Sequence, residues 1–424
     1  MIMGSFMRRK IALMIGYTDI IIRQVSKMNS RVDGNTVIAE LSGKIDSTNA
    51  PQLEQELEEI LRTHEESVLA LDADSLEYIS SAGLRVLMKI RKNQGGLTVI
   101  NVSRDVYDIF DVTGFVDILD VKRKLRQISV EGCELLGKGG NGEVYRIDPE
   151  TILKVYNEGA ALEKIALEKQ YATATFKEGL PCAIAYDTVK VGTRFGIVFE
   201  LLNAVTVGKA VNETPDRIPE IGEMMGKLLR QLHGTEMRDG VLPKISDKMF
   251  GWIDYIEEKY LSHEDAELLR EVVRAVPEKN TLLHLDFHEG NVMLQDGELI
   301  LIDLDDVCVG NPVYDLCAYY IGHILASQSA PDAVEKSLGM NIENVAKIYT
   351  ETMRSYLGTE DEAVLSAHNQ QMQLFSLFWM IVYLGKGKDS SNLTHERANG
   401  VIQMVLPQFK QVAPMIIQMV QGWK

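Results

Sequence analysis

The chain has 424 residues, 46% hydrophobic and 25% charged, with a net charge of −17 and an isoelectric point near 5.0. This length exceeds one typical domain, so we expect two or three compact units. The acidic balance argues against general nucleic-acid binding, which needs a basic surface. The four cysteines form no C-x-x-C pair and no short disulfide framework, which favours a reducing compartment and a cytoplasmic protein.

Two apolar stretches raise the question of a membrane segment. Residues 11–22 follow three basic residues, as in a weak signal peptide, but they contain Asp19 and no cleavage site of small residues follows. Residues 374–385 are fewer than the roughly 20 that a membrane-spanning helix needs. We therefore predict no membrane segment. We expect residues 1–29 to be a disordered N-terminal extension and residues 374–385 to be a buried core helix.

Strand and helix patterns alternate over residues 30–125. Residues 36–46 alternate between apolar and polar types and are rich in strand formers. In the following segment Leu53, Leu57 and Leu61 recur at helical spacing after a cluster of Ser, Thr, Asn and Pro. Further strands are predicted at 67–72 and 97–102 with a helical segment between them, then an amphipathic helix and a return to strand at 104–119. This alternation predicts a small α/β domain with helices packed on a sheet.

The segments SGKIDSTNAPQLEQEL, LDADSLEYISSAGLRVL and VYDIFDVTGFVDIL make this region similar to the STAS domain, the fold of bacterial anti-sigma-factor antagonists. In that family a serine within a D-S-S-G-L element at a helix start is phosphorylated by a partner kinase. The serine corresponds here to Ser81 and the glycine to Gly83, whereas Ser80 replaces the aspartate and Ala82 the second serine. The resemblance implies a protein partner and makes Ser81 a phosphorylation candidate, because a helix N-terminus tolerates an added phosphate. The alternative is that Ser80 and Ser81 only cap the helix.

A glycine-rich segment, CELLGKGGNGEVYRI, opens the second predicted domain. Gly137, Gly139 and Gly142 form a G-x-G-x-x-G pattern, followed by Val144. In a dinucleotide-binding fold this pattern would lie between a strand and a helix. Here EVYRI, DPET and ILKVY predict a strand, a tight turn and a second strand. A hairpin with a glycine-rich tip is typical of the loop that covers the phosphates of ATP in kinases.

Lys154, in ILKVY, occupies the place of the phosphate-binding lysine of kinases, with an exposed strand lysine as the alternative. Kinase chemistry needs a helix carboxylate that pairs with this lysine. The next helical segment offers Glu163 and Glu168, and we favour Glu168 because EKQYA resembles the corresponding helix of bacterial small-molecule kinases. A later strand lies where kinases bind adenine, so Glu200 and Leu202 would act mainly through main-chain atoms.

The segment HLDFHEGNVM, followed by IDLDD, concentrates groups that bind protons, metals or phosphate. Phosphoryl transfer needs a carboxylate that orients the acceptor hydroxyl and Mg²⁺ that neutralises the phosphates. Asp286 and Asn291 have the spacing of a kinase catalytic loop, so Asp286 is the predicted catalytic residue and Asn291 a predicted metal ligand. Asp303 would also bind Mg²⁺, and Asp305 would share its face of an extended chain and assist.

Zinc binding is an alternative for this segment, because His284, Asp286 and His288 offer two imidazoles and a carboxylate. It would leave the glycine-rich hairpin and the predicted lysine unexplained. A purely structural cluster of acidic turn residues is a further alternative. We expect His284 to brace the loop backbone and assign His288 no definite role.

Together, GKGGNGEVY, ILKVY, GKLLRQLHG, HLDFHEGNVM, LILIDLDD and GNPVYDLC look like an aminoglycoside and choline phosphotransferase-type kinase, in the right order over residues 133–320. The resemblance implies a two-lobed fold, ATP and Mg²⁺, and a supporting role for Asp315 beneath the catalytic loop. Glu289 stands where the family commonly has proline, a departure that we expect to matter little to the chemistry.

The spacing after Asp303 bears on the phosphate acceptor. GNPVYDLC follows too closely for the activation segment of a protein kinase, which favours a small acceptor with a hydroxyl or amine. In related kinases, helices like those predicted over residues 322–424 line the acceptor pocket. Plain core packing is the alternative reading for most of their Met-rich apolar positions.

We therefore predict an α/β STAS-like domain at residues 30–125, followed by a two-lobed α+β protein-kinase-like domain at 128–424 with a helical C-terminal region. The N-lobe would cover about 128–205 and the C-lobe about 206–424. The predicted activity is ATP- and Mg²⁺-dependent phosphoryl transfer to a small molecule, regulated through the STAS module. Two alternatives stay open: a protein serine kinase that modifies the STAS serine in its own chain or a partner's, and a non-enzymatic sigma-pathway binder with a relic kinase domain.

Overall fold

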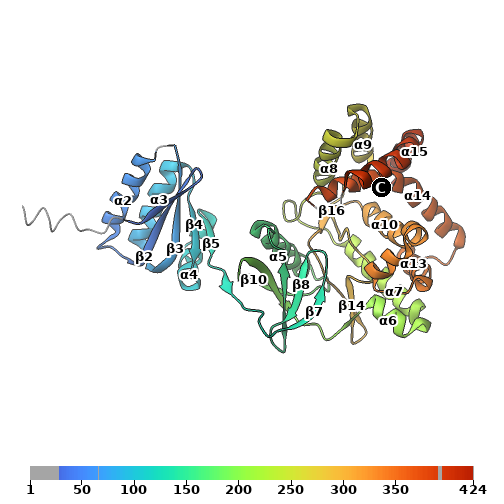
Figure 1. The fold of residues 1–424 in the computed structure, drawn as a ribbon, viewed down its shortest axis with the longest axis horizontal. Helices are drawn as coiled ribbons and strands as arrows, with labels where there is room; N and C mark the ends of the chain where they lie inside the picture. The colour runs from blue at the N-terminus through green and yellow to red at the C-terminus, as the bar shows by residue number, and fades with distance from the viewer. Residues whose placement is uncertain (1–27, 65, 390–393, 424) are drawn as a thin grey trace, which may run out of the picture. The chain divides into compact units, whose positions relative to one another are not determined.

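The chain is described here from a computed structural model, in which the described residues are 28–64, 66–389 and 394–423. It divides into two compact units after Arg126 (Figure 1). All but the last two residues of the predicted N-terminal extension lie outside the described residues.

A five-stranded sheet with the order β1-β2-β3-β4-β5 forms the centre of the first unit. β1 pairs antiparallel with β2, and the pairs from β2 to β5 are parallel. Helices connect the parallel strands, as the alternating pattern predicts. The elements are β1 (Ser30–Asp33), β2 (Thr36–Ile45), α2 (Ala50–Thr63), β3 (Val68–Ile79), α3 (Ser81–Gln94), β4 (Thr98–Val102), α4 (Arg104–Val112), the 3-10 turn Phe115–Asp117 and β5 (Asp120–Arg123).

The close approach of α3 to the sheet fixes where its N-terminus lies. An added Cβ at Gly83 would lie 2.6 Å from the Ile45 side chain and 2.7 Å from that of Ile79, so only glycine allows this contact. Ser80 caps the helix, because its hydroxyl accepts the Gly83 N–H. Ser81, at the first helical position, is exposed.

A six-stranded sheet forms the N-terminal lobe of the second unit, with the order β6-β10-β11-β9-β8-β7. Helix α5 packs on β10 and β11, and apolar residues of β9, β10 and β11 form the core of this lobe. The elements are β6 (Arg126–Gln127), β7 (Glu134–Lys138), β8 (Gly142–Arg146), β9 (Thr151–Tyr156), α5 (Leu162–Lys177), β10 (Ala185–Val191) and β11 (Arg194–Glu200).

Helices dominate the C-terminal lobe, where they enclose one large apolar core. Two small sheets have the orders β12-β14-β15 and β13-β16, and the segment after β15 contacts the N-terminal lobe through Asp303 and Asp305. The helices are α6 (Val207–Glu213), α7 (Ile218–Gly234), α8 (Ile245–Tyr260), α9 (His263–Ala275), α10 (Val313–Tyr320), α11 (Ala326–Ser329), α12 (Pro331–Leu338), α13 (Ile342–Leu357), α14 (Glu362–Val382) and α15 (His395–Gln421). The strands are β12 (Val205–Thr206), β13 (Thr281–Leu283), β14 (Val292–Gln295), β15 (Glu298–Leu301) and β16 (Cys308–Gly310), and shorter turns are Pro215–Arg217, Ile321–Leu325 and Tyr383–Asp389.

The apolar stretch 374–385 lies mainly in α14, where Phe375, Phe378 and Trp379 are buried in the core. The α-helix ends at Val382 and a 3-10 turn follows. Gly385 in that turn packs on Trp252 so closely that an added Cβ would lie 2.4 Å from the tryptophan backbone oxygen. Among the described residues, no helix combines the length and the apolar character needed to cross a membrane.

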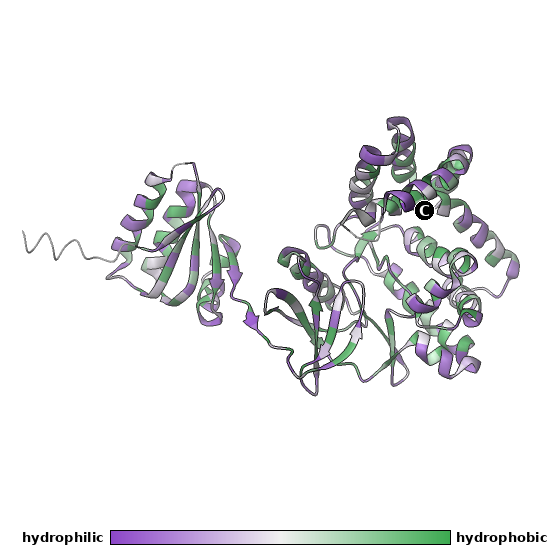
Figure 2. Ribbon diagram, in the orientation of Figure 1, coloured by the Kyte–Doolittle hydropathy of each residue, from purple (hydrophilic) through white to green (hydrophobic). Residues whose placement is uncertain are grey.

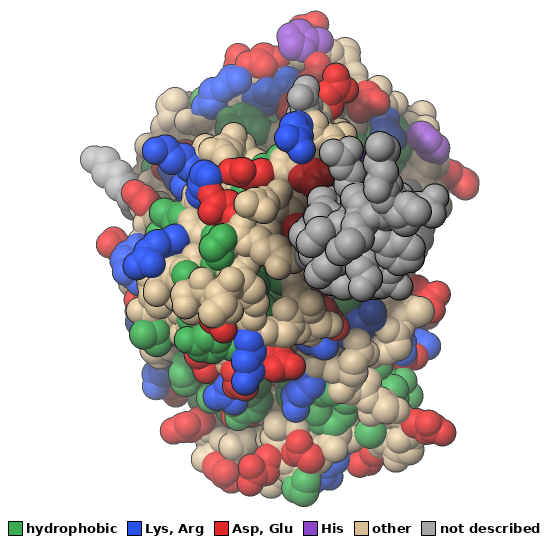
Figure 3. Space-filling view, turned by 90° about the vertical axis from the view of Figure 1, so that its left-hand side faces the viewer, with side chains coloured by type: hydrophobic (Ala, Val, Ile, Leu, Met, Phe, Trp, Pro, Cys, Tyr) green, Lys and Arg blue, Asp and Glu red, His purple; other side chains and the backbone are tan. Residues whose placement is uncertain are grey.

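Hydrophobic residues run along the strands of the first unit and along helices of the C-terminal lobe (Figure 2). On the face that Figure 3 presents, acidic and basic side chains are interspersed. The architecture confirms the predicted α/β domain followed by a two-lobed α+β domain with a helical C-terminal region.

Candidate active site

Three charged side chains meet between the two lobes of the second unit. Lys154 Nζ on β9 lies 2.8 Å from Glu168 Oε1 on α5 and 2.6 Å from Asp303 Oδ1, which follows β15. Burial would lower the pKa of Lys154, but the Glu168 and Asp303 carboxylates outweigh burial and raise it above the ordinary value. Glu163, the other carboxylate considered for this pair, is exposed, and Val144 on β8 lies opposite Lys154 in the sheet register.

The glycine-rich loop joins β7 to β8, as the strand pattern predicts. At Gly142 an added Cβ would lie 2.1 Å from the carbonyl oxygen of Val155 on the neighbouring strand β9. At Gly137 and Gly139 an added Cβ would meet nothing within 4 Å. Gly142 is therefore required by strand packing, whereas the other two positions leave open space beside the loop.

Alanine substitutions at Gly142 and Gly139 should show that strand packing requires glycine at the first position and not at the second. We expect Gly142→Ala to lower the free energy of unfolding by about 1–3 kcal/mol, because the backbone of β9 must move. Gly139→Ala, the matched control, should change it by less than about 0.5 kcal/mol. Denaturant unfolding of both variants checks this expectation, and equal stability of the two variants would contradict it.

The tip of the glycine-rich loop is tied to the C-terminal lobe. Asn141 Nδ2 donates a hydrogen bond to Asp305 Oδ2 at 3.0 Å. Within the N-terminal lobe, Asn157 donates its N–H to the Asn141 carbonyl at 3.1 Å and its side chain to the Gly140 carbonyl at 2.7 Å. Sequence reasoning did not single out Asn141, because its partner is 164 positions away and no local pattern reveals the contact.

The loop between β13 and β14 brings Asp286 and Asn291 together. Asn291 Nδ2 donates to both the main-chain oxygen and the Oδ2 atom of Asp286, each at 3.0 Å. The Asp286 side chain is 46% exposed and so is open to an acceptor. His288 Nδ1 accepts the Gly290 N–H at 3.0 Å, which puts the proton of a neutral ring on Nε2, 3.8 Å from Asp286 Oδ2.

Asp315 on α10 holds the start of this loop. Its carboxylate accepts the backbone N–H groups of His284 at 2.8 Å and Leu285 at 2.7 Å, and His233 Nε2 lies 3.1 Å away. Leu285 has a φ of 62°, an unusual value for a residue with a branched side chain, and this anchor holds it there. His284 Nε2 contacts the Ile302 carbonyl at 3.2 Å, which agrees with a bracing role.

Negative charge is concentrated directly after Asp303. Burial, together with Asp306 and Asp303, raises the pKa of Asp305 to about 7. Burial would also raise the pKa of Asp306, but Lys386, whose Nζ lies 2.5 Å from Asp306 Oδ2, lowers it. Carboxylates crowded in this way favour a cation beside them.

The oxygen atoms present suit Mg²⁺ better than zinc. Asp303 offers a carboxylate, and Asn291 has its Oδ1 left for a ligand because its Nδ2 is bonded to Asp286. Within the described part of the chain, no group of three or more His, Cys, Asp and Glu residues is arranged to hold a metal ion. The two histidines proposed for zinc each use one ring nitrogen for a main-chain contact, Nε2 of His284 and Nδ1 of His288, and zinc lacks support because no such group forms around them in the described part of the chain.

The segment predicted to face adenine follows β11. Glu200 is fixed to Ile184, because its N–H donates to the Ile184 carbonyl at 3.1 Å and its Oε1 accepts the Ile184 N–H at 2.8 Å. The Leu201 N–H donates to the Glu150 carbonyl at 2.7 Å, and Leu202 follows in the irregular segment before β12. Since the Glu200 side chain is engaged by the protein, a ligand would meet mainly main-chain groups here.

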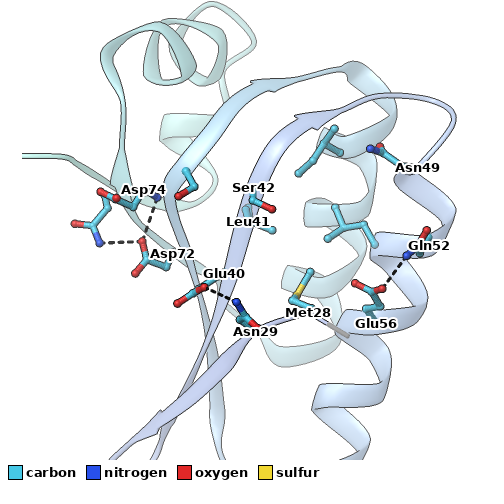
Figure 4. A pocket seen from close by; sticks show the side chains of 14 residues that line it. Met28, Asn29, Glu40, Leu41, Ser42, Asn49, Gln52, Glu56, Asp72 and Asp74 are labelled. Atoms are coloured by element: carbon cyan, nitrogen blue, oxygen red, sulfur yellow. Dashed lines mark hydrogen bonds between the residues drawn. The ribbon is translucent and has the colours of Figure 1, made fainter. Parts of the chain in front are cut away.

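The first unit contains a separate cavity of about 690 Å³ beside β2, β3 and α2 (Figure 4). Glu40, Glu56, Asp72 and Asp74 line it, and Asn101 Nδ2 donates to Asp72 at 2.9 Å. Among the described residues that line it there is no His, Cys, Lys or Arg. These described lining residues therefore do not include a pair of lysine and carboxylate like that of the second unit.

The fold and the site define a kinase-like phosphotransferase domain preceded by an α/β domain. Comparison with known families agrees: the Phosphotransferase enzyme family matches residues 132–335, and the STAS domain matches residues 27–128. The chain thus belongs to the STAS family through its N-terminal domain, and its second domain matches the model of the phosphotransferase enzyme family. It is a phosphotransferase enzyme with a STAS regulatory module.

Individual relatives fall into the same two groups. The chain is 40% identical over 95 residues to BtrV of Bordetella bronchiseptica. The matched segment is 22% of this chain and 80% of BtrV. It is 32% identical over 105 residues to the anti-sigma-B factor antagonist of Bacillus subtilis, 23% of this chain and 94% of that protein. Among solved structures, the ADP-bound aminoglycoside phosphotransferase APH(2'')-Ib is 14% identical with a TM-score of 0.44, over 65% of this chain and 91% of that one. A choline/ethanolamine kinase family protein from Mesorhizobium loti is 16% identical with a TM-score of 0.41, over 68% of this chain and 92% of that one.

Proposed function

We propose that this enzyme transfers the γ-phosphoryl group of ATP, with Mg²⁺, to a hydroxyl or amine of a small molecule. The observation that carries the proposal is the convergence of Lys154, Glu168 and Asp303 from β9, α5 and the segment after β15. This is the arrangement of lysine, helix carboxylate and metal-binding aspartate that phosphoryl transfer requires.

Each side chain has a chemical task in this proposal. Lys154, held charged by Glu168, binds the phosphates, while Asp286 accepts a hydrogen bond from the acceptor and orients it for attack. Asp303 and Asn291 hold Mg²⁺, which supplies positive charge to the phosphate oxygens when bound. The glycine-rich loop and the segment containing Glu200 and Leu202 would contact the nucleotide through main-chain groups.

The short connection after Asp303 supports a small acceptor. β16 and then α10, which begins at Val313, follow it within ten residues. An activation segment, which protein kinases use to bind a peptide substrate, does not fit in this length. The helices of residues 322–424 are the elements that we propose to shape the acceptor site.

A metabolite screen tests the proposal. Purified protein with ATP and Mg²⁺ should release ADP above its background only when the acceptor is present. Amines, amino alcohols, sugars and nucleosides would be the first compounds, each assayed in parallel with the Asp286→Asn variant. ADP release that is the same for both proteins would argue against catalysis at this loop.

For the STAS domain, we propose regulation through phosphorylation of Ser81. Its exposed position in the first turn of α3 supports this, since free N–H groups and the helix dipole favour a phosphate there. The domain would then bind or release a protein partner according to the charge on Ser81.

Labelled ATP separates the two possible acceptors of phosphate. We expect no label on the chain itself when it is incubated with [γ-³²P]ATP and Mg²⁺, because the active site suits a small molecule. Label that appears on the wild type and disappears in Ser81→Ala, while Ser67→Ala remains labelled, would instead support the protein-kinase alternative.

A further inference from the structure

Glu289 forms a buried network directly behind the catalytic loop. It lies between Asp286 and Asn291 in the sequence, and it is fully buried. Its Oε1 accepts the Tyr319 hydroxyl at 2.7 Å, and its Oε2 lies 2.7 Å from His323 Nε2. Both carboxylate oxygens therefore have partners, and both partners come from one helical segment.

The buried network holds a charged carboxylate. Burial would raise the pKa of Glu289, but His323 and Tyr319 lower it, so the carboxylate is charged. His323 Nδ1 faces the Tyr319 carbonyl at 2.8 Å. Both ring nitrogens of His323 therefore lie within hydrogen-bond distance of an oxygen atom. Thr352 Oγ1 lies 3.3 Å from the Tyr319 hydroxyl and completes the group.

One face of a single helical segment anchors the catalytic loop twice. Asp315 and Tyr319 of α10 and His323 of the following π-helical turn are spaced four residues apart, so their side chains lie on one face. Asp315 binds the loop at His284 and Leu285, whereas Tyr319 and His323 bind it at Glu289. The π-helical turn is a rare geometry that is often found at functional sites.

The two anchors bracket Asp286. One holds the residues immediately before it and the other holds the residue three positions after it. The Glu289 carbonyl also accepts the Gly208 N–H at 3.2 Å, which fixes this point to α6. The loop backbone is thus restrained on both sides of the side chain that would orient the acceptor.

We propose that Glu289, held by Tyr319 and His323, is a positioning residue that sets the geometry of Asp286 and Asn291 for phosphoryl transfer. The proposal rests on the proposed function of these two residues. From the sequence, Glu289 stands where related kinases commonly have proline and was expected to matter little to the chemistry. The proposal instead assigns this residue a role in positioning the catalytic loop. The role depends on the hydrogen bonds of Glu289 and not on its charge.

Two substitutions separate hydrogen bonding from charge. In Glu289→Gln the amide can accept the Tyr319 hydroxyl and donate to a neutral His323, so the network is rebuilt without charge. In Glu289→Ala both partners are lost. With Mg²⁺-ATP and the acceptor found by the metabolite screen as substrates, and ADP release as the readout, we expect Glu289→Ala to lower kcat about tenfold or more with KM for ATP within about threefold. Glu289→Gln should stay within about threefold of the wild type.

Hydrogen exchange provides a readout that does not need turnover. In Glu289→Ala the amides of Gly290 and Asn291 should exchange about tenfold faster or more, while those of His284 and Leu285 keep their protection because the Asp315 anchor is intact. Asp315→Asn should show the reverse pattern. Phe409→Leu, a buried change on α15, is the control for lost stability alone and should alter neither segment nor ADP release.

The outcomes are distinct. A folded Glu289→Ala protein with wild-type kcat, or with unchanged exchange at Gly290 and Asn291, overturns the inference, as does a Glu289→Gln variant that is as impaired as Glu289→Ala. If the wild type releases no ADP under any condition, the proposed function fails, and the exchange pattern alone then decides whether Glu289 positions the loop.

Discussion

Replacing Asp286 with asparagine should abolish phosphoryl transfer while leaving nucleotide binding nearly intact. A positioned carboxylate that takes part in proton transfer contributes about 10²- to 10⁴-fold to a rate, so ADP release should fall by that factor. The Asn291 side chain donates to the main-chain oxygen of Asp286 as well as to its carboxylate. The hydrogen bond to the main-chain oxygen is unaffected by the substitution. The loop should therefore keep its shape, and the dissociation constant for Mg²⁺-ATP should change less than about threefold.

The matched control for this prediction is Asp216→Asn, an exposed carboxylate in the same lobe. It should leave both kcat and nucleotide affinity at wild-type values. Steady-state kinetics and calorimetric titration of both variants provide the test. If Asp286→Asn turns over substrate as fast as Asp216→Asn, the catalytic loop has been assigned wrongly.

The second large effect is expected at Asp303, where loss of the carboxylate should weaken ATP binding in the presence of Mg²⁺ but not in its absence. Asp303 has a φ of 59°, in the left-handed region, and asparagine tolerates this geometry with little strain. In Asp303→Asn the metal loses an anionic ligand, so affinity for ATP in the presence of Mg²⁺ should fall by about tenfold or more. Without Mg²⁺ the affinity should rise or stay equal, because a carboxylate no longer competes with the phosphates for Lys154.

Titration calorimetry with Mg²⁺, and again with a chelator, measures both effects on one protein. Asp296→Asn serves as the control, since it is another aspartate with a positive φ (50°) but lies in the turn between β14 and β15. Equal affinity of wild type and Asp303→Asn in Mg²⁺ would remove Asp303 from the metal site.

The sequence predicts those parts of the site that depend on local spacing. The distance between Asp286 and Asn291 along the chain, and the glycine hairpin before Lys154, are patterns within single segments. The structure brings Lys154, Glu168 and Asp303 into contact, although 149 positions separate the lysine from the aspartate. The resemblance to kinases predicts the pair of Lys154 with Glu168, whereas the contact of Lys154 with Asp303 was not predicted, because neither composition nor periodicity indicates which distant carboxylate meets a lysine.

The contacts that the sequence does not reveal are those between distant, individually ordinary residues. Asn141 meets Asp305 only because the glycine-rich loop folds over the segment after β15. Glu289 looked like a minor departure in the catalytic loop, since its partner His323 lies 34 positions later in an apolar segment. Beyond the end of α14 at Val382, Gly385 packs against Trp252, a contact across the core that no local pattern reveals.

A structure of the protein with Mg²⁺ and a non-hydrolysable ATP analogue tests the account most directly. We expect the metal to contact the oxygen atoms of Asp303 and Asn291, and Lys154 Nζ to leave Asp303 for the phosphates while it keeps its bond to Glu168. A nucleotide bound elsewhere, or a Lys154–Asp303 pair that persists with the phosphates out of reach of both residues, would contradict the account.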